Sequence, residues 1–285
     1  MALIQSAPVA RAQTKDAFRT LASALAENRV ILAYQPVISV RLGNVPAFTE
    51  CLARVVSKDG TISSAGPLIA ETEASDLGRV LDRTVLRKAL TTLKACPERR
   101  LSINLSALGV GDQEWLALLQ AANEETPGIA EWLVVEITET ASLRLDATAV
   151  DFLFELRRMG VSLALDDFGS GHTSLRQLGK FRFDFLKIDK GLCSGLEGDE
   201  KGQRVLASVL RIARHFDMVT VAEGVETQVD ADILIEAGVD CLQGYHLGEP
   251  QTSPKWLIAG TSSGQAAGEP PHGVLDGEPD RRPAS

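Results

Sequence analysis

The chain has 285 residues, of which 45% are hydrophobic and 24% are charged, values typical of a globular protein. This length fits a single α/β barrel of about 200–250 residues with short tails. The formal net charge of −9 argues against a nucleic-acid polymer or an anionic membrane as a partner, because both bind clustered lysines and arginines.

The spacing of the cysteines and the length of the apolar runs indicate in which cellular compartment the protein lies. Cys51, Cys96, Cys193 and Cys241 contain no closely spaced pair, which argues against a zinc knuckle or a disulfide framework. They are typical of reduced thiols in a cytoplasmic protein. No apolar run reaches the roughly 20 residues that span a bilayer, and the first residues lack the pattern of a signal peptide. We therefore expect a cytoplasmic location and no membrane insertion.

The first predicted elements are a helix over residues 15–28, where apolar residues recur at helical spacing, and strands over 29–40 and 47–56. The short connection through Gly43 and Asn44 predicts that these two strands are antiparallel.

Beyond these strands, helices alternate with short apolar strands. We expect helices at 65–77, 79–95, 112–125, 146–160, 173–180, 201–216 and 228–238, and strands at 100–106, 131–139, 161–167, 183–189, 218–224 and 240–245. The alternation predicts right-handed βαβ units and a mostly parallel sheet. Roughly eight strand candidates favour a closed, TIM-like (β/α)8 barrel over an open sheet.

The predicted domain organisation has three parts. An N-terminal extension covers residues 1–14, the barrel covers 15–260, and a tail covers 261–285. The tail is rich in Gly, Pro, Ser and charged residues and is too poor in apolar residues to fold, so we expect it to be disordered.

Polar residues stand at the ends of the predicted strands. Because side chains alternate faces along a strand, the sequence of each strand indicates which of its side chains point into the barrel. The carboxyl ends of barrel strands meet at one mouth, where barrel enzymes build their sites. Glu50 lies deeper, in an early strand that can run the other way. The pattern predicts a ring of oxygen ligands: Glu50, Asn104, Glu136, Asp166, Asp167 and Glu223.

So many carboxylates cannot stay ionised together in a partly buried mouth unless cations neutralise them. Ligation by oxygen alone favours Mg²⁺ or Mn²⁺. There are more carboxylates than one ion needs, which indicates two ions, a recurrent arrangement for the hydrolysis of phosphate esters. Lys187 adds a cation to the same mouth.

Each of these residues also has a simpler interpretation. Asp167 or Glu139 alone fits a turn residue or a helix N-cap, Asn104 alone fits a turn cap, and Lys187 alone could face solvent. The joint placement on successive strand ends favours the functional interpretation for the set.

Eight sequence pieces occur in the order of a known family: "YQPVISV", "ECLAR", "SINLS", "VEITET", "LALDDFGSGHTSL", "FDFLKID", "VAEGVET" and "QGY". Together they resemble the EAL family of cyclic di-GMP phosphodiesterases, from about Phe18 to Trp256. Eight ordered motifs are far more specific than one short pattern. The resemblance implies a (β/α)8 barrel with one antiparallel strand and two-metal hydrolysis of cyclic di-GMP to linear 5′-pGpG, which lowers the level of this bacterial second messenger.

Carried over position by position, the resemblance implies the same six metal-site residues that the strand pattern selects. It implies that Lys187 helps to hold the attacking water and that Glu223 assists its deprotonation, with the choice of general base between the two left open. With Glu50, which is also a metal ligand, these form the implied catalytic set.

The resemblance also implies supporting residues. Gln35, Arg54 and Gln243 match positions that support the substrate or the site, and the forked donors of Arg54 suit a phosphate oxygen. Glu139 matches a glutamate that steadies the loop after the paired aspartates. That loop, Asp167–Leu175, is similar to the segment that couples the metal site to dimerisation, which implies a homodimer.

The sequence departs from the family pattern at three positions: Cys51 in the name motif, Val55 in place of a tryptophan, and His172 where a tyrosine is common. No metal-site position is lost. Two alternatives stay open: a catalytically silent EAL module that binds cyclic di-GMP or a protein partner, and a barrel enzyme of another class with a single Mg²⁺ and Lys187 as its base.

Overall fold

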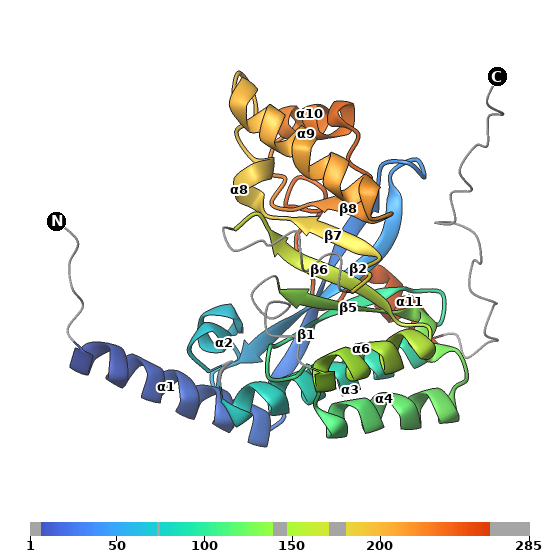
Figure 1. The fold of residues 1–285 in the computed structure, drawn as a ribbon. Coiled ribbons are helices and arrows are strands. Elements are labelled where there is room, and N and C mark those ends of the chain that lie inside the picture. The colour runs from blue at the N-terminus through green and yellow to red at the C-terminus, as the bar shows by residue number, and fades with distance from the viewer. Residues whose placement is uncertain (1–6, 73–74, 139–146, 171–180, 263–285) are drawn as a thin grey trace.

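The computed structural model describes residues 7–72, 75–138, 147–170 and 181–262 (Figure 1). The helix predicted for 173–180 lies outside these residues.

Eight strands of the described chain close into a barrel, and a ninth lies outside it. The order around the barrel is β1-β9-β8-β7-β6-β5-β4-β2, and β1 pairs again with β2. The strands are β1 (Val30–Ser39), β2 (Val45–Val56), β3 (Ile62–Ser64), β4 (Leu101–Leu105), β5 (Leu133–Thr138), β6 (Ser162–Phe168), β7 (Phe185–Ile188), β8 (Val219–Ala222) and β9 (Cys241–Leu242). The predicted barrel with one antiparallel strand is therefore confirmed.

The antiparallel strand is β1. It pairs antiparallel with both β2 and β9, whereas β2 pairs parallel with β4. The expectation that the strand of Glu50 can run the other way is therefore wrong. A hairpin makes two strands antiparallel to each other, but only their pairing with the rest of the barrel decides which one is reversed. Glu50 lies opposite Ser102, in the middle of the long strand β2.

Helices cover the outside of the barrel. They are α1 (Ala7–Ala26), α2 (Gly66–Thr72), α3 (Asp76–Ala95), α4 (Gln113–Glu125), α6 (Ala147–Arg158), α8 (Lys190–Cys193), α9 (Glu200–His215), α10 (Gln228–Ala237) and α11 (Lys255–Ser262), with a 3-10 turn η1 (Ile129–Trp132). In Figure 1, α3, α4 and α6 lie against one part of the wall, and α9 and α10 lie on the opposite side. Among the helices described, none is long and apolar enough to cross a membrane.

The element boundaries differ from the predicted ones mainly at the ends. The first helix begins at Ala7, before the predicted start at residue 15. The sequence pattern missed β3, α8 and α11, because each is too short to show a clear periodicity.

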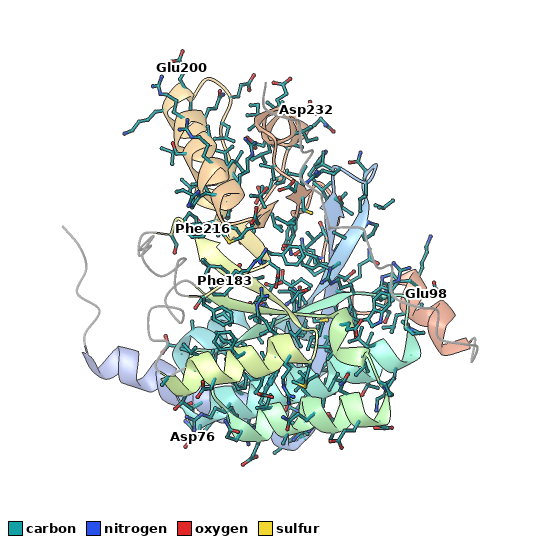
Figure 2. All side chains as sticks on the ribbon, turned by 45° about the vertical axis from the view of Figure 1, so that its right-hand side comes forward. Asp76, Glu98, Phe183, Glu200, Phe216 and Asp232 are labelled. Carbon is teal, nitrogen blue, oxygen red and sulfur yellow. The ribbon has the colours of Figure 1, made fainter. Side chains whose placement is uncertain are left out.

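Two apolar regions stabilise the barrel. The larger one fills the space between strands and helices and contains Cys51, Trp115 and Leu119. The smaller one fills the barrel interior: Val37, Phe48, Val134, Ala164, Phe185, Val221 and Cys241. Figure 2 shows charged side chains such as Glu200 and Asp232 on the outer helices. The four cysteines are free and buried.

A buried ion pair joins the helices on either side of β4. Arg83 of α3 donates from Nε and Nη2 to the two carboxylate oxygens of Asp112, at 2.8 and 2.9 Å. Asp112 also caps α4 by accepting from the backbone N–H groups of Glu114 and Trp115. This carboxylate therefore stabilises the start of α4 and holds it against α3.

Replacing Asp112 should destabilise the protein. We expect Asp112→Ala to lower the free energy of unfolding by roughly 2–3 kcal/mol, because α4 loses its cap and Arg83 loses its buried partner. Glu114→Ala is the matched control, since its carboxylate also contacts Arg83 but is 76% exposed, and its effect should stay below about 0.5 kcal/mol. Urea denaturation followed by circular dichroism measures both, and equal losses would contradict the interpretation.

Candidate active site

A buried lysine lies at the centre of the barrel mouth. Lys187 on β7 is only 1% exposed. Its Nζ lies 2.5 Å from Glu136 Oε2, 2.7 Å from Glu223 Oε1, 3.1 Å from Asp166 Oδ1 and 3.6 Å from Glu50 Oε2. An ammonium group can be buried only if such partners replace its water. Lys187 therefore brings carboxylates from β2, β5, β6 and the end of β8 to one point.

The carboxylates outnumber this single ammonium group. Burial raises the pKa of Glu136 well above its usual range, and the charge of Glu50 adds to this effect. Burial also raises the pKa of Glu223 to about 8 and raises the pKa of Asp167. Burial alone would lower the pKa of Lys187, but the surrounding carboxylates, with Asp166 the strongest, hold it well above the usual value. The excess negative charge therefore needs protons or cations.

Glu50 is held in its ionised form by donors on both oxygens. Asn104 Nδ2 donates to Oε1 at 2.9 Å, and Gln243 Nε2 donates to Oε2 at 2.5 Å. Burial works against the charge, but Lys187 and these two amides outweigh it and lower the pKa of Glu50. Gln35 continues the network, since its Oε1 lies 3.4 Å from Gln243 Nε2 and its own Nε2 donates to the Gly248 carbonyl.

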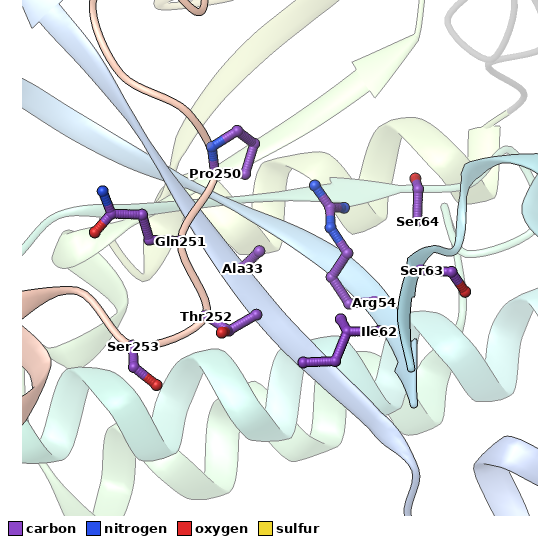
Figure 3. A pocket seen from close by; sticks show the side chains of 9 residues that line it. All are labelled: Ala33, Arg54, Ile62, Ser63, Ser64, Pro250, Gln251, Thr252 and Ser253. Carbon is purple, nitrogen blue, oxygen red and sulfur yellow. The ribbon is translucent and has the colours of Figure 1, made fainter. Parts of the chain in front are cut away.

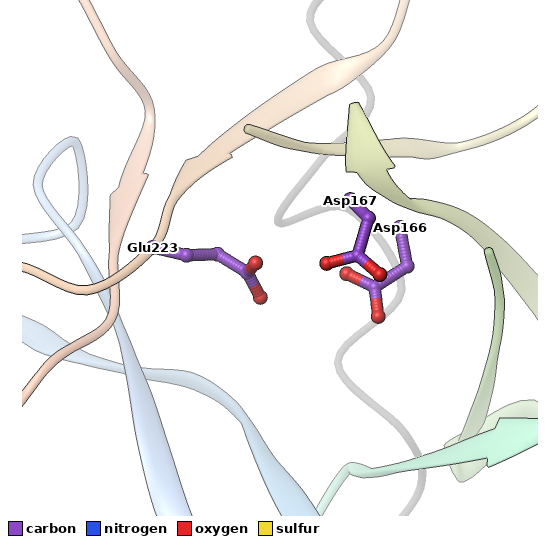
Figure 4. A group of neighbouring side chains, drawn as sticks. All are labelled: Asp166, Asp167 and Glu223. Carbon is purple, nitrogen blue, oxygen red and sulfur yellow. The ribbon is translucent and has the colours of Figure 1, made fainter. Parts of the chain in front are cut away.

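Three carboxylates face one another at the open side of the mouth. Asp166, Asp167 and Glu223 each place an oxygen within 4.8 Å of the other two (Figure 4). Glu136 contributes a buried oxygen, Oε1, that accepts no hydrogen bond from the described residues. The group of possible ligands found among the described residues contains carboxylates and no His or Cys, and oxygen donors in excess fit Mg²⁺ or Mn²⁺. The residues present are therefore suited to hold divalent cations.

The end of β6 explains how two consecutive aspartates serve one site. In a regular strand, neighbouring side chains point to opposite faces. The pairing of β6 with β7 shifts register between Leu165 and Phe168, and Asp167 adopts a left-handed φ of 59°. This local change turns both carboxylates toward Glu223.

Arg54 lies outside the carboxylate cluster. It follows Glu50 by four residues on β2 and borders a hollow of about 540 Å³ (Figure 3). The hollow is lined by Ala33, Arg54, Ile62, Ser63, Ser64, Pro250, Gln251, Thr252 and Ser253. Arg54 donates to the Ala53 carbonyl at 3.0 Å and pairs with no carboxylate among the described residues. Its guanidinium group is therefore available to an anionic group such as a phosphate.

Most of the predicted site residues come together in the structure. Glu50, Asn104, Glu136, Asp166, Asp167, Lys187 and Glu223 line the mouth, and Gln35 and Gln243 join it through Glu50. Arg54 borders the adjacent hollow, while Glu139 and His172 lie outside the described residues. The sequence pattern missed Ser63 and Ser64 beside Arg54, since β3 is short and shows no alternation.

Comparison with known proteins agrees with this arrangement. The profile of the EAL domain matches residues 19–250. The chain is 31% identical to the cyclic di-GMP phosphodiesterase PdeB of Shewanella oneidensis, over 81% of this chain and 28% of that protein. It is 30% identical to the probable cyclic di-GMP phosphodiesterase PdeN of Escherichia coli, over 81% of this chain and 45% of that protein. The chain thus spans less than half the length of these curated relatives.

Solved structures show the same fold. A PaMucR phosphodiesterase in complex with c-di-GMP matches 84% of this chain and 98% of its own, with a TM-score of 0.75 and 26% identity. The FimX EAL domain from Pseudomonas aeruginosa bound to c-di-GMP matches 84% of this chain and 97% of its own, with a TM-score of 0.74 and 25% identity. The family profile covers most of the sequence. This chain belongs to the EAL domain family.

Proposed function

We propose that this chain is a cation-dependent phosphodiesterase that hydrolyses cyclic di-GMP to linear 5′-pGpG. The observation that carries the proposal is the cluster at the barrel mouth, where an excess of carboxylates surrounds Lys187. The family membership and the relatives named cyclic di-GMP phosphodiesterases support this substrate.

The proposed ligands of two Mg²⁺ or Mn²⁺ ions are Glu50, Asn104, Glu136, Asp166, Asp167 and Glu223. Such ions would polarise the phosphodiester and favour ionisation of the attacking water. The oxygen of the water bonds to phosphorus, the bond from phosphorus to the 3′-oxygen breaks, and that oxygen takes up a proton.

Side chains of this chain have distinct tasks in the proposed reaction. Arg54 donates to a phosphate oxygen from the edge of its hollow. Lys187 holds the attacking water by donating from its ammonium group, and the proton that the water loses passes to the carboxylate of Glu223, whose Oε1 lies 2.7 Å from Lys187 Nζ. Gln243 keeps Glu50 in place by donating from its amide, and Gln35 accepts from the same amide group of Gln243.

Three further expectations remain predictions. They are the homodimer through Asp167–Leu175, of which the structure describes Asp167–Ser170, the cytoplasmic location, and the division into 1–14, 15–260 and 261–285. The role of Glu139 in steadying the loop after Asp167 also stays a prediction, since Glu139 lies outside the described residues.

The purified chain should convert cyclic di-GMP to 5′-pGpG in the presence of Mn²⁺ or Mg²⁺, and EDTA should stop the conversion. Chromatography of the nucleotides measures substrate and product. Stoichiometric binding of cyclic di-GMP without product would contradict the proposal and favour a silent receptor instead.

Removing a single ligand charge should abolish most of the activity. We expect Glu50→Gln and Asp166→Asn each to lower kcat/KM by more than about 100-fold, because replacing even an outer partner of a ligand typically costs about 10–100-fold. The matched control is Asp151→Asn, an exposed carboxylate on α6, which should leave kcat/KM unchanged. Steady-state kinetics at saturating Mn²⁺ measures all three, and near wild-type rates in both site variants would exclude the proposed ligands.

Cation binding should depend on pH in a defined direction. Since the pKa of Glu223 is raised to about 8 in the metal-free protein, its carboxyl group is protonated below that pH and a cation must displace the proton. We therefore expect the affinity for Mn²⁺ to rise between about pH 6 and 8, with release of protons at pH 7. Calorimetry in two buffers of different ionisation enthalpy measures the release. Glu223→Gln should weaken binding and flatten this dependence, and an unaltered dependence in that variant would refute the assignment.

A further inference from the structure

A carboxylate stands on the apolar face of a helix outside the barrel. In α3, the residues that face the barrel include Leu81, Val85 and Leu86, all buried. Asp82 lies among them and is only 8% exposed. A buried carboxylate is costly unless hydrogen bonds satisfy it, so its partners show what it is there to hold.

Asp82 accepts hydrogen bonds from the turn that follows β4. Oδ2 of Asp82 accepts from the hydroxyl of Ser106 at 2.6 Å and from the backbone N–H of Ser106 at 3.3 Å. The N–H of Gly109 in turn donates to the carbonyl and the hydroxyl of Ser106. A Cβ on Gly109 would lie 2.3 Å from Asp82 Oδ2 and 2.6 Å from Leu105 Cδ1. The turn is therefore closed tightly around this carboxylate.

The proposed ligand Asn104 stands two residues before Ser106. Its side chain is exposed, and the hydrogen bond from its Nδ2 to Glu50 leaves its amide oxygen as the atom for a cation. An exposed side chain has few neighbours to hold it, so its position depends on the backbone beneath it. The hydrogen bonds from Ser106 to Asp82 fix that backbone at the point where the strand ends.

We infer that Asp82 is a positioning residue for the cation site, acting through Ser106 to place the amide oxygen of Asn104. This inference rests on the proposed function, because it requires Asn104 to be a ligand. Neither the family motifs nor the polar pattern of the strands includes Asp82.

The test is the affinity of the full chain for Mn²⁺ without substrate, followed by the electron paramagnetic resonance signal of the free ion. We expect Asp82→Ala to weaken binding about 10-fold, the low end for a residue that orients a ligand. Asp82→Asn, which keeps an acceptor oxygen, should weaken it less. With excess Mn²⁺, kcat of Asp82→Ala should recover toward the wild-type value, because the residue takes no part in the reaction itself.

Arg79→Met is the matched control. Arg79 also reaches from α3 to this loop, where its Nε donates to the Leu108 carbonyl at 3.0 Å, but it does not contact Ser106 in the described structure. The affinity of the Arg79→Met variant for Mn²⁺ should stay within about twofold of wild type. Thermal unfolding in EDTA, measured for every variant, separates lost stability from lost affinity.

Ser106→Ala removes only the hydroxyl group that donates to Asp82. It tests the same hydrogen bond if Asp82→Ala does not fold. It should weaken Mn²⁺ binding in the same direction. Wild-type affinity in Ser106→Ala and in every folded Asp82 variant would overturn the inference, as would an equal loss in Arg79→Met. A wild-type chain that binds no Mn²⁺ would overturn both the inference and the proposed cation site.

Discussion

The burial of one ammonium group among four carboxylates is the constraint on which the barrel mouth depends. Lys187 is almost completely buried, and its partners come from β2, β5, β6 and the residue that follows β8. An ammonium group loses more by desolvation than a single ion pair returns, so the site is stable only when several carboxylates converge. That convergence requires the closed barrel, because Glu50 and Glu223 are far apart in the sequence and meet only around its axis. The site can therefore form only when the sheet is closed.

The charge balance of the same cluster is the reason for proposing a cation site there. One lysine cannot neutralise all the surrounding carboxylates. Burial raises the pKa values of Glu136 and Glu223, and the charge of the neighbouring carboxylates adds to this effect. Glu50 differs because two amides and Lys187 favour its ionised form, so its pKa is lowered instead. In the proposed cation site, a carboxylate that is ionised before any cation arrives would be a suitable anchor, and the protonated ones would exchange their protons for a cation.

Much of the predicted site follows from the alternation of side chains between the two faces of each strand. Polar residues at the ends of apolar strands stand out because a buried strand otherwise has no reason to contain them, and this placed Asn104, Glu136 and Asp166 correctly at the mouth. The direction of β2 could not be read in this way, since alternation is the same in both directions. Alternation does not predict the position of the Asp167 side chain either. That position depends on the left-handed backbone of Asp167 and on the shift in register between β6 and β7.

The surroundings of the site depend on contacts between distant segments. The hollow beside Arg54 combines β3 with residues 250–253, and no local pattern in either segment predicts that they meet.

The buried position of Asp82 can, in contrast, be recognised from the local sequence, because Asp82 is a charged residue on the apolar stripe of a helix. Such a residue must have a buried donor, and in a barrel the donors nearest to a covering helix are the turns at the ends of the strands it packs on. The layer of helices can therefore do more than bury apolar surface, since a single carboxylate in it can hold the turn next to a proposed ligand.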